Sequence, residues 1–156
     1  MTKIRKFKEK DEEQIKSMIK TVLTEIFGNF GIRKWEDFKD YDIVYIAEDK
    51  EKIIGSAALK SLENKTGKLK RMYIHKEYRN KGIGKKLLKK IENFAIKNKL
   101  NRIVLSTSDI QLKPAFEFYK KNGFKEITKV DLERDFQDLK NENVNLSETK
   151  FMEKLL

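Results

Sequence analysis

Two glycines and a group of cations stand together where an apolar segment gives way to a helical pattern. The stretch RNKGIGKK holds Gly82 and Gly84 between Arg79 and the lysines at 81, 85 and 86. The first turn of a helix leaves backbone amides unpaired and carries partial positive charge, so it attracts phosphate. Glycine would let the main chain approach such an anion closely. The stretch is typical either of a phosphate-binding turn or of a glycine-softened turn before a lysine-rich amphipathic helix.

Two nucleotide-binding motifs that contain similar glycines do not match this stretch. The P-loop needs a glycine where Arg79 stands and a serine or threonine where Lys86 stands. The dinucleotide fingerprint needs a third glycine where Leu87 stands, and its strand lies near the start of a βαβ unit. Both motifs are therefore excluded.

Hydrophobic periodicity indicates the elements that surround the glycine turn. From Glu12 onward, apolar residues repeat with the spacing of an amphipathic helix, which stops at the breaker GNFG after Phe27. A second helix follows the glycines. KPAFEFYKKNG indicates a third, with Pro114 in its first turn and Gly123 as its C-terminal cap. RKWEDFKD is typical of a short helix or a loop. Strands are expected at residues 3–7, 42–49, 52–62, 67–75, 101–108, 124–132 and 149–156.

The order of these elements predicts a mixed α/β fold in a single domain, residues 1–156. A chain of 156 residues can bury one sizeable core and is too short for two ordinary ones. The strands at 42–49 and 52–62 flank EDKEK and are expected to form an antiparallel hairpin. The helical connections require some parallel pairing as well.

The composition excludes several kinds of site and sets a default location. The chain has no cysteine, which removes disulfides, thiolate metal sites and a cysteine nucleophile. Its one histidine, His75, lacks a cluster of further ligands, so we expect no metal and a structural or rim position for His75. There is no apolar leader and no run of about 18 apolar residues, so we expect a soluble cytoplasmic protein without a membrane partner.

The net charge of +11 raises nucleic-acid binding as an alternative function. Lysine supplies most of the positive charge, and it is scattered along the chain and interleaved with acidic residues. Such patterns are typical of solvated helix faces. No module that reads or stacks bases is recognisable. The charge instead predicts attraction for an anionic small molecule or an acidic partner, and no nucleic acid is expected.

Two motifs together resemble the GNAT superfamily, the GCN5-related N-acetyltransferases. The first is the strand LKRMYIH followed by Arg79, Gly82 and Gly84, which match the family's Arg/Gln-x-x-Gly-x-Gly/Ala, and then a helix. The second is AFEFYKKNGFKEI, which resembles the later family motif of Ala, Tyr and Gly-Phe. The resemblance runs from Tyr41 to Ile127. It implies a mostly antiparallel central sheet of about six or seven strands, with one parallel splayed pair, flanked by about four helices.

The resemblance also implies acetyl-CoA as cosubstrate and places it on three segments. In the family the strand before the glycine turn and the next strand splay apart, and the cofactor lies between them. Main chain near Met72 would then act as oxyanion donor to the thioester carbonyl. The expected cofactor-binding residues are Met72, Tyr73 and Ile74 for the pantetheine arm, Arg79, Asn80, Lys81, Gly82, Ile83, Gly84 and Lys85 for the diphosphate, and Ser106 and Thr107 on the next strand.

The implied chemistry is acetyl transfer from a thioester to a primary amine of a small molecule or peptide. Tyr119 occupies the family's Tyr position and is the expected acid for the departing thiolate, although aromatics at helical spacing also pack cores. With no cysteine, an acyl-cysteine route is closed, so we expect direct transfer in a ternary complex. A non-catalytic acyl-CoA-binding sensor or scaffold remains as an alternative.

The sequence departs from the family at the general base. Relatives commonly place a glutamate on the strand that enters the glycine turn, where this chain has Lys68, Lys70 and Arg71. Candidates are then Glu25, Glu48 and Glu63, a water chain, or an acceptor that arrives neutral. The family's Asn before the Ala of the later motif is also missing, and Leu112 stands near its place.

The acceptor side and the oligomeric state are the least determined features. The resemblance to the family implies that residues 27–40 lie over the acceptor. Phe30 and Trp35 are therefore expected to bind substrate as an aromatic wall, with Phe38 nearby. Alternatively, these rings pack the helix–loop junction. A homodimer is possible, with TKFMEKLL as an edge strand that pairs between copies.

Overall fold

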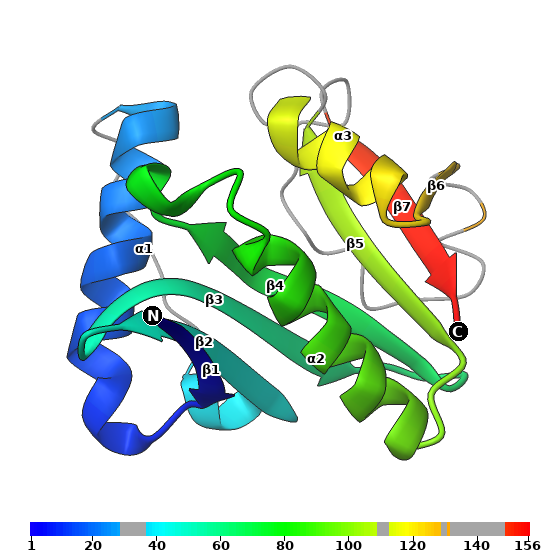
Figure 1. Ribbon diagram of the computed structural model, residues 1–156. Helices are drawn as coiled ribbons and strands as arrows, with labels where there is room; N and C mark the ends of the chain where they lie inside the picture. The colour runs from blue at the N-terminus through cyan, green and yellow to red at the C-terminus, as the bar shows by residue number, and fades with distance from the viewer. Residues whose placement is uncertain (29–36, 109–112, 129–130, 132–148) are drawn as a thin grey trace.

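A seven-stranded sheet in the order β1-β2-β3-β4-β5-β7-β6 forms the centre of the protein (Figure 1). The computed structural model describes residues 1–28, 37–108, 113–128, 131 and 149–156. The α-helices of this part are α1 (Glu12–Phe27), α2 (Ile83–Lys97) and α3 (Lys113–Lys121). The strands are β1 (Thr2–Lys6), β2 (Ile43–Asp49), β3 (Lys52–Ser61), β4 (Thr66–Ile74), β5 (Arg102–Ser108), β6 (Lys125–Ile127) and β7 (Thr149–Leu155).

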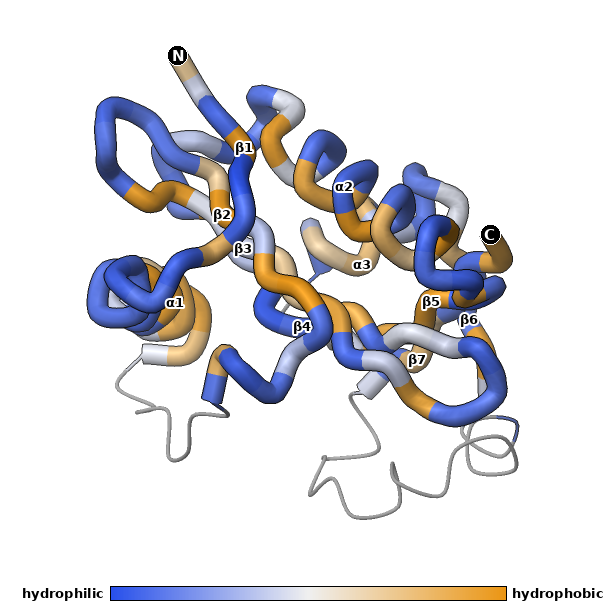
Figure 2. Tube along the Cα trace, turned by 90° about the horizontal axis from the view of Figure 1, so that it is seen from below, coloured by the Kyte–Doolittle hydropathy of each residue, from blue (hydrophilic) through white to orange (hydrophobic). Residues whose placement is uncertain are grey.

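The two faces of the sheet are covered by different helices (Figure 2). Strand residues alternate between faces, so Val44 and Ile46 of β2 pack with the apolar face of α1, whereas Tyr45 and Ala47 belong to the cluster under α2 and α3. Both long helices bury one stripe and leave charged residues outside, as their sequence periodicity predicts. The larger core therefore lies between the sheet and the helix that follows the glycine turn.

Two tight turns fix the registers of β2, β3 and β4. Lys50 and Glu51 between β2 and β3 have φ values of 47° and 67°, and Asn64 and Lys65 between β3 and β4 have 56° and 53°. Positive φ at both central residues gives the twist that suits an antiparallel hairpin. The expected hairpin of β2 and β3 is thus confirmed, and β4 extends it antiparallel to β3.

β4 and β5 pair in parallel over a short distance and then separate. Their partners are Thr66 with Arg102, Gly67 with Ile103 and Lys68 with Val104. β4 continues to Ile74 against β3, and β5 continues to Ser108 against β7. Beyond Lys68 the facing edges of β4 and β5 therefore have no strand partner in the described part of the chain. The expected splayed parallel pair is confirmed.

The predicted elements agree with the structure except at the C-terminal end. Both long helices, and the third helix followed by Gly123 at φ +91°, lie where periodicity predicts them. TKFMEKLL is a strand, but the prediction that it forms an edge was wrong, because β7 lies between β5 and β6. The expected strand at 124–132 is described only as β6. RKWEDFKD ends in a short 3-10 helix at Phe38–Asp40, and residues 33–36 of it lie outside the described residues.

The helix count is lower than the expected four, with three α-helices and three short 3-10 helices in the described ranges. The 3-10 segments are Glu9–Asp11, Phe38–Asp40 and Lys76–Tyr78. Among the described residues, no helix is long and apolar enough to span a membrane.

The core under α2 generates a stability prediction. Leu87 is 0% exposed, whereas Ile96 on the same helix is 56% exposed. Leu87→Ala should lower the free energy of unfolding by about 2–5 kcal/mol, because it removes apolar contacts and leaves a cavity. Ile96→Ala should change it by less than about 0.5 kcal/mol. Urea unfolding of both variants measures the difference, and equal effects would contradict this account of the core.

Candidate cofactor and catalytic site

The glycine turn presents unpaired amides at the start of α2. Gly82 is the N-cap residue, with φ +79°, a left-handed conformation that favours glycine. The amide of Lys86 donates to the carbonyl of Gly82 at 3.1 Å and is the first amide bonded within the helix. The amides of Ile83, Gly84 and Lys85 precede it and have no intrahelical acceptor. A Cβ on Gly82 would meet no atom within 4 Å, so the space beside this turn is open.

Hydrogen bonds join the segment before the glycines to α1, β4 and β2. Arg79 donates from its two terminal nitrogens to Glu25 of α1 at 2.7 and 2.9 Å, and from Nε to the carbonyl of Ile74 at 3.0 Å. The Tyr78 hydroxyl donates to Asp49 of β2 at 3.1 Å. These contacts hold the turn in place without using its amides. The side chain of Arg79 is thus an anchor for the turn.

Some of the other residues predicted to bind the diphosphate expose their side chains, and Ile83 can expose only its main chain. Asn80 also has a positive φ, 62°, and Lys81 and Lys85 are exposed. Lys81 places its ammonium 5.4 Å from the centre of the Tyr78 ring. Ile83 is buried in the core, so only its main chain can face a ligand. The turn therefore offers backbone amides backed by mobile positive charge at its surface.

The separated ends of β4 and β5 supply the second part of the site. Met72, Tyr73 and Ile74 lie beyond the parallel pairing and are half-buried. Across from them, Thr107 of β5 is 7% exposed, and its hydroxyl has no hydrogen-bond partner among the residues that the structure describes. A buried polar atom without a protein partner is costly unless a ligand or water satisfies it. Ser106 is exposed and alternates with Thr107, so the two side chains face opposite sides of the sheet.

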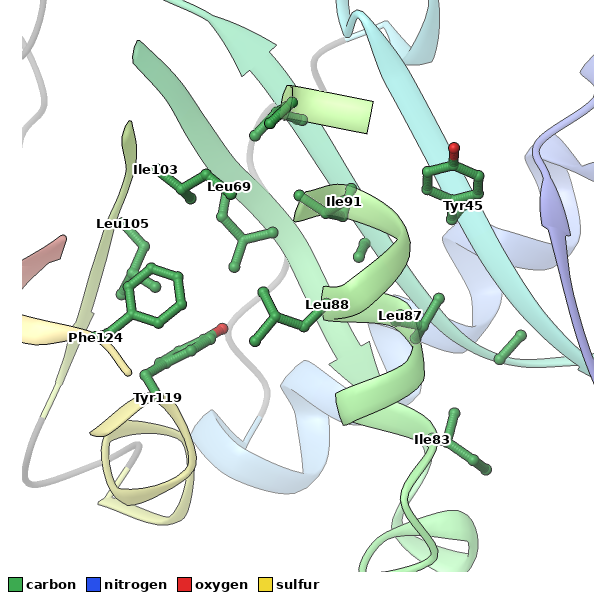
Figure 3. Packing of buried hydrophobic residues seen from close by; sticks show 14 of the residues in the cluster. Tyr45, Leu69, Ile83, Leu87, Leu88, Ile91, Ile103, Leu105, Tyr119 and Phe124 are labelled. Carbon is green, nitrogen blue, oxygen red and sulfur yellow. The ribbon is translucent and has the colours of Figure 1, made fainter. Parts of the chain in front are cut away.

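Tyr119 points from α3 into the core beside this opening (Figure 3). It is 6% exposed, and its ring lies 5.4 Å from Phe118 and 5.6 Å from Phe124 between centroids. Burial raises the pKa of Tyr119 above its ordinary value, with a further contribution from Tyr73. The phenol is therefore neutral, and able to donate a proton, throughout the physiological range. Core packing and proton donation are compatible in this position.

A bulge in β4 brings together polar groups that the sequence did not indicate. The register of β3 and β4 shifts between Ser56 and Ala58, and Arg71 has φ +54°. The Ser56 hydroxyl donates to the carbonyl of Arg71 at 2.7 Å, and Arg71 Nε donates to the Tyr41 hydroxyl at 3.1 Å. Burial raises the pKa of Tyr73, and the nearby Arg71 opposes this rise. No local sequence signal could have shown that Tyr41 and Arg71 meet.

The three candidate general bases are placed unfavourably for that role. Glu25 is paired with Arg79, and Glu48 accepts from Arg5 Nε at 2.6 Å. Glu63 is exposed in the turn between β3 and β4, at the opposite end of β4 from the glycine turn. The structure does not bring any of these carboxylates to the opening between β4 and β5 as an unpaired group.

The remaining predictions concern His75 and the aromatic residues on the expected acceptor side. His75 caps a 3-10 helix, with Nδ1 accepting from the amide of Glu77 at 3.4 Å, which matches the expected structural role. Within the described ranges no group of three or more potential metal ligands is present. Phe30 and Trp35 lie outside the described residues. Phe38 is buried and its ring lies 5.2 Å from that of Phe7, as expected for packing at the helix–loop junction.

Comparison with known families and structures agrees with this geometry. Residues 40–126 match the family model of the acetyltransferase (GNAT) domain. An acetyltransferase of the GNAT family from Staphylococcus aureus MU50 has a similar structure, with a TM-score of 0.82 and 26% identity, over 100% of this chain and 99% of that one. The chain belongs to the GNAT acetyltransferase family.

Two further similarities extend the comparison. N-acetylaspartate synthetase of Xenopus tropicalis is 33% identical over 88 residues, which are 56% of this chain and 32% of that protein. The matched segments cover about a third of the length of that synthetase and of N-acetyltransferase 8B of Homo sapiens. The fold is shared with the PaiA N-acetyltransferase of Thermoplasma acidophilum in complex with coenzyme A, with TM-score 0.75, 20% identity, and coverage of 100% and 99% of the two chains.

The described residues fit coenzyme A by two independent observations. Open space beside Gly82 leaves the first amides of α2 accessible to a diphosphate, and positive charge surrounds them. The unpartnered Thr107 hydroxyl and the unpaired edges of β4 and β5 can accept a polar chain such as pantetheine. Gly84 has a different role, since a Cβ there would meet the Phe118 ring at 3.3 Å and the residue therefore lets α2 pack closely against α3.

These observations predict the effect of filling the space beside the turn. Gly82→Ala should weaken coenzyme A binding by at least about tenfold, since the Cβ would stand beside the open amides and a left-handed alanine is strained. Gly28→Ala is a matched control, because Gly28 has φ +70° and also no atom within 4 Å. Gly82→Ala should lose about 1 kcal/mol of stability. Gly28→Ala should lose about 1–3 kcal/mol, because its ψ of −146° lies outside the left-handed helical region. Calorimetric titration with coenzyme A should show the affinity loss in Gly82→Ala alone; an equal loss in both would contradict the assignment.

Proposed function

We propose that this chain is an acetyl-CoA-dependent N-acetyltransferase that acts on a primary amine of a small molecule or peptide. The observation that carries the proposal is the open amide turn at the start of α2 beside the separated ends of β4 and β5. Relatives support the same class of reaction, since they include N-acetyltransferase 8B of Homo sapiens and the N-acetylaspartate synthetase.

The residues of the chain supply binding, orientation and one proton. The amides of Ile83, Gly84 and Lys85 would hold the diphosphate, and the free main-chain edge at Met72–Ile74 would align the pantetheine and polarise the thioester carbonyl. The amine attacks that carbonyl, the carbon–sulfur bond breaks, and the Tyr119 hydroxyl gives its proton to the departing thiolate. An ammonium acceptor loses one proton to water before it attacks, because the nearby glutamates are ion-paired. The attacking nitrogen then loses a second proton, which restores the phenol of Tyr119.

A non-catalytic acyl-CoA-binding protein is the second candidate function. The observation that favours it is the ion pairing of Glu25 and Glu48, together with Lys68, Lys70 and Arg71 where relatives carry an acid. Both candidates predict binding of coenzyme A, so turnover must separate them. Release of coenzyme A from acetyl-CoA, followed across a panel of amines, amino acids, polyamines and N-terminal peptides, tests the proposal. Tight acetyl-CoA binding without acceptor-dependent thiol release would favour the second candidate.

The absence of a cysteine nucleophile predicts that the acetyl group passes directly from acetyl-CoA to the acceptor. The sequence holds no cysteine, so an acyl-cysteine intermediate is closed to this chain. Initial rates at varied acetyl-CoA and acceptor should therefore give intersecting reciprocal plots, as expected for a ternary complex. Parallel plots would contradict direct transfer.

The role of Tyr119 predicts both a rate and a pH dependence. Tyr119→Phe keeps the ring contacts with Phe118 and Phe124 and removes the donor. It should lower kcat by about 10²–10⁴-fold with little effect on stability. Because burial raises the pKa of Tyr119, the neutral donor persists as pH rises, so kcat of the wild type should not fall between about pH 7 and 9.5. A turnover within a few-fold of wild type in Tyr119→Phe would exclude the acid role.

A further inference from the structure

A groove lies between α2 and the edge strand β1, separate from the opening between β4 and β5. Its volume is about 360 Å³, and it is lined by Thr2, Ile4, Lys86, Lys89, Lys90 and Asn93. β1 is one of the two edges of the sheet, and α2 runs beside it on the same face (Figures 1 and 2). The proposed acetyltransferase chemistry makes no use of this groove.

One wall of the groove is a free strand edge. β1 pairs with β2 in a constant register, and the amide of Phe7 donates to the carbonyl of Val44 at 2.8 Å. Hydrogen-bonded and non-hydrogen-bonded pairs alternate in an antiparallel ladder, so Lys3 and Arg5 also direct their main-chain groups to β2. Thr2 and Ile4 then direct theirs away from the sheet. These are the two residues of β1 that line the groove, and they present a template for another strand.

The other wall is a row of cations on α2. Lys86, Lys89 and Lys90 recur at the spacing of one helical face and are all exposed. Within the described part of the chain, none of the three side-chain ammonium groups has an ion-pair or hydrogen-bond partner. Lys154, by contrast, places its ammonium 2.6 Å from a carboxylate oxygen of Glu92 on α2. The three ammonium groups of the groove are therefore open to carboxylates of a partner.

We infer that this groove binds an extended acidic peptide segment of a partner protein, which adds a strand to β1 and directs its carboxylates toward the lysines of α2. An added strand satisfies the main-chain groups of Thr2 and Ile4. Every second side chain of that strand faces α2, so alternating acidic residues meet the lysine row, and Ile4 provides apolar contact. A second copy of this chain is disfavoured because pairing β1 with itself would bring Lys3 and Lys6 near cations of the same kind.

A capped hexapeptide of alternating glutamate and valine is the probe. Its binding to the full chain is measured by calorimetry at about 0.15 M salt, where exposed charges more than about 8 Å apart are largely screened from one another. The main-chain contribution is tested with two further peptides, N-methylated on all glutamate amides or on all valine amides. One of the two methylated peptides should bind at least about tenfold more weakly than the unmodified peptide, and the other should bind almost as well. The reason is that either the glutamate amides or the valine amides face β1, but not both.

The lysine contribution is tested with matched variants. Lys89→Gln/Lys90→Gln should weaken peptide binding by about 3- to 30-fold, since it removes two exposed ion pairs. Lys97→Gln/Lys121→Gln removes the same charge at exposed positions outside the groove and should change the affinity by less than about twofold. Coenzyme A affinity should be the same in both variants, and saturating coenzyme A should not displace the peptide.

Several results would overturn the inference. Equal weakening in both lysine variants, or equal binding of the two methylated peptides, would show a diffuse charge effect without strand addition. Absence of peptide binding at this salt concentration would exclude the site. Dimerisation that depends on Lys89 and Lys90 would assign the groove to a second copy of the chain. Competition by an oligothymidylate of equal charge, with the same lysine dependence, would assign the groove to nucleic acid.

Discussion

The separation of β4 and β5 is the constraint on which the candidate site depends. Main-chain amides and carbonyls inside a protein need partners, and a sheet normally provides them from the next strand. Here the parallel ladder stops at Lys68 and Val104, so beyond these residues the facing edges of β4 and β5 have no strand partner within the described ranges. A ligand with amide groups of its own can occupy that position as a strand would. The unpartnered Thr107 hydroxyl lies on the same stretch, and the open amides of α2 lie beyond its end.

The rest of the fold keeps this opening from closing. β3 holds β4 on one side and β7 holds β5 on the other, so each strand is anchored away from the gap. The bulge at Arg71, fixed by the Ser56 hydroxyl, changes the course of β4 where the separation begins. Arg79 joins the glycine turn to Glu25 of α1. The glycine turn is therefore held against the helix on the other face of the sheet.

Ion pairing also changes how the reactive groups can be assigned. A glutamate near an amine-binding site suggests a base, yet a carboxylate oxygen that already accepts a hydrogen bond from a guanidinium is engaged with that partner. Glu25 and Glu48 are both held in ion pairs, by Arg79 and Arg5 respectively. Burial acts in the opposite direction at Tyr119, where it keeps the phenol protonated. The environment of each group, more than its identity, decides which can act as acid or base.

The sequence by itself determined the elements that depend on local patterns: the apolar stripes of α1 and α2, the hairpin of β2 and β3, and the glycine turn of Gly82 and Gly84. These follow from side-chain periodicity and backbone freedom, which act over a few residues. Only the tertiary structure decided that β7 lies between β5 and β6, that Glu25 pairs with Arg79, and that Thr107 lacks a partner. Such contacts join residues far apart in the chain. Their energies depend on distance and burial in the folded state, which local periodicity does not encode.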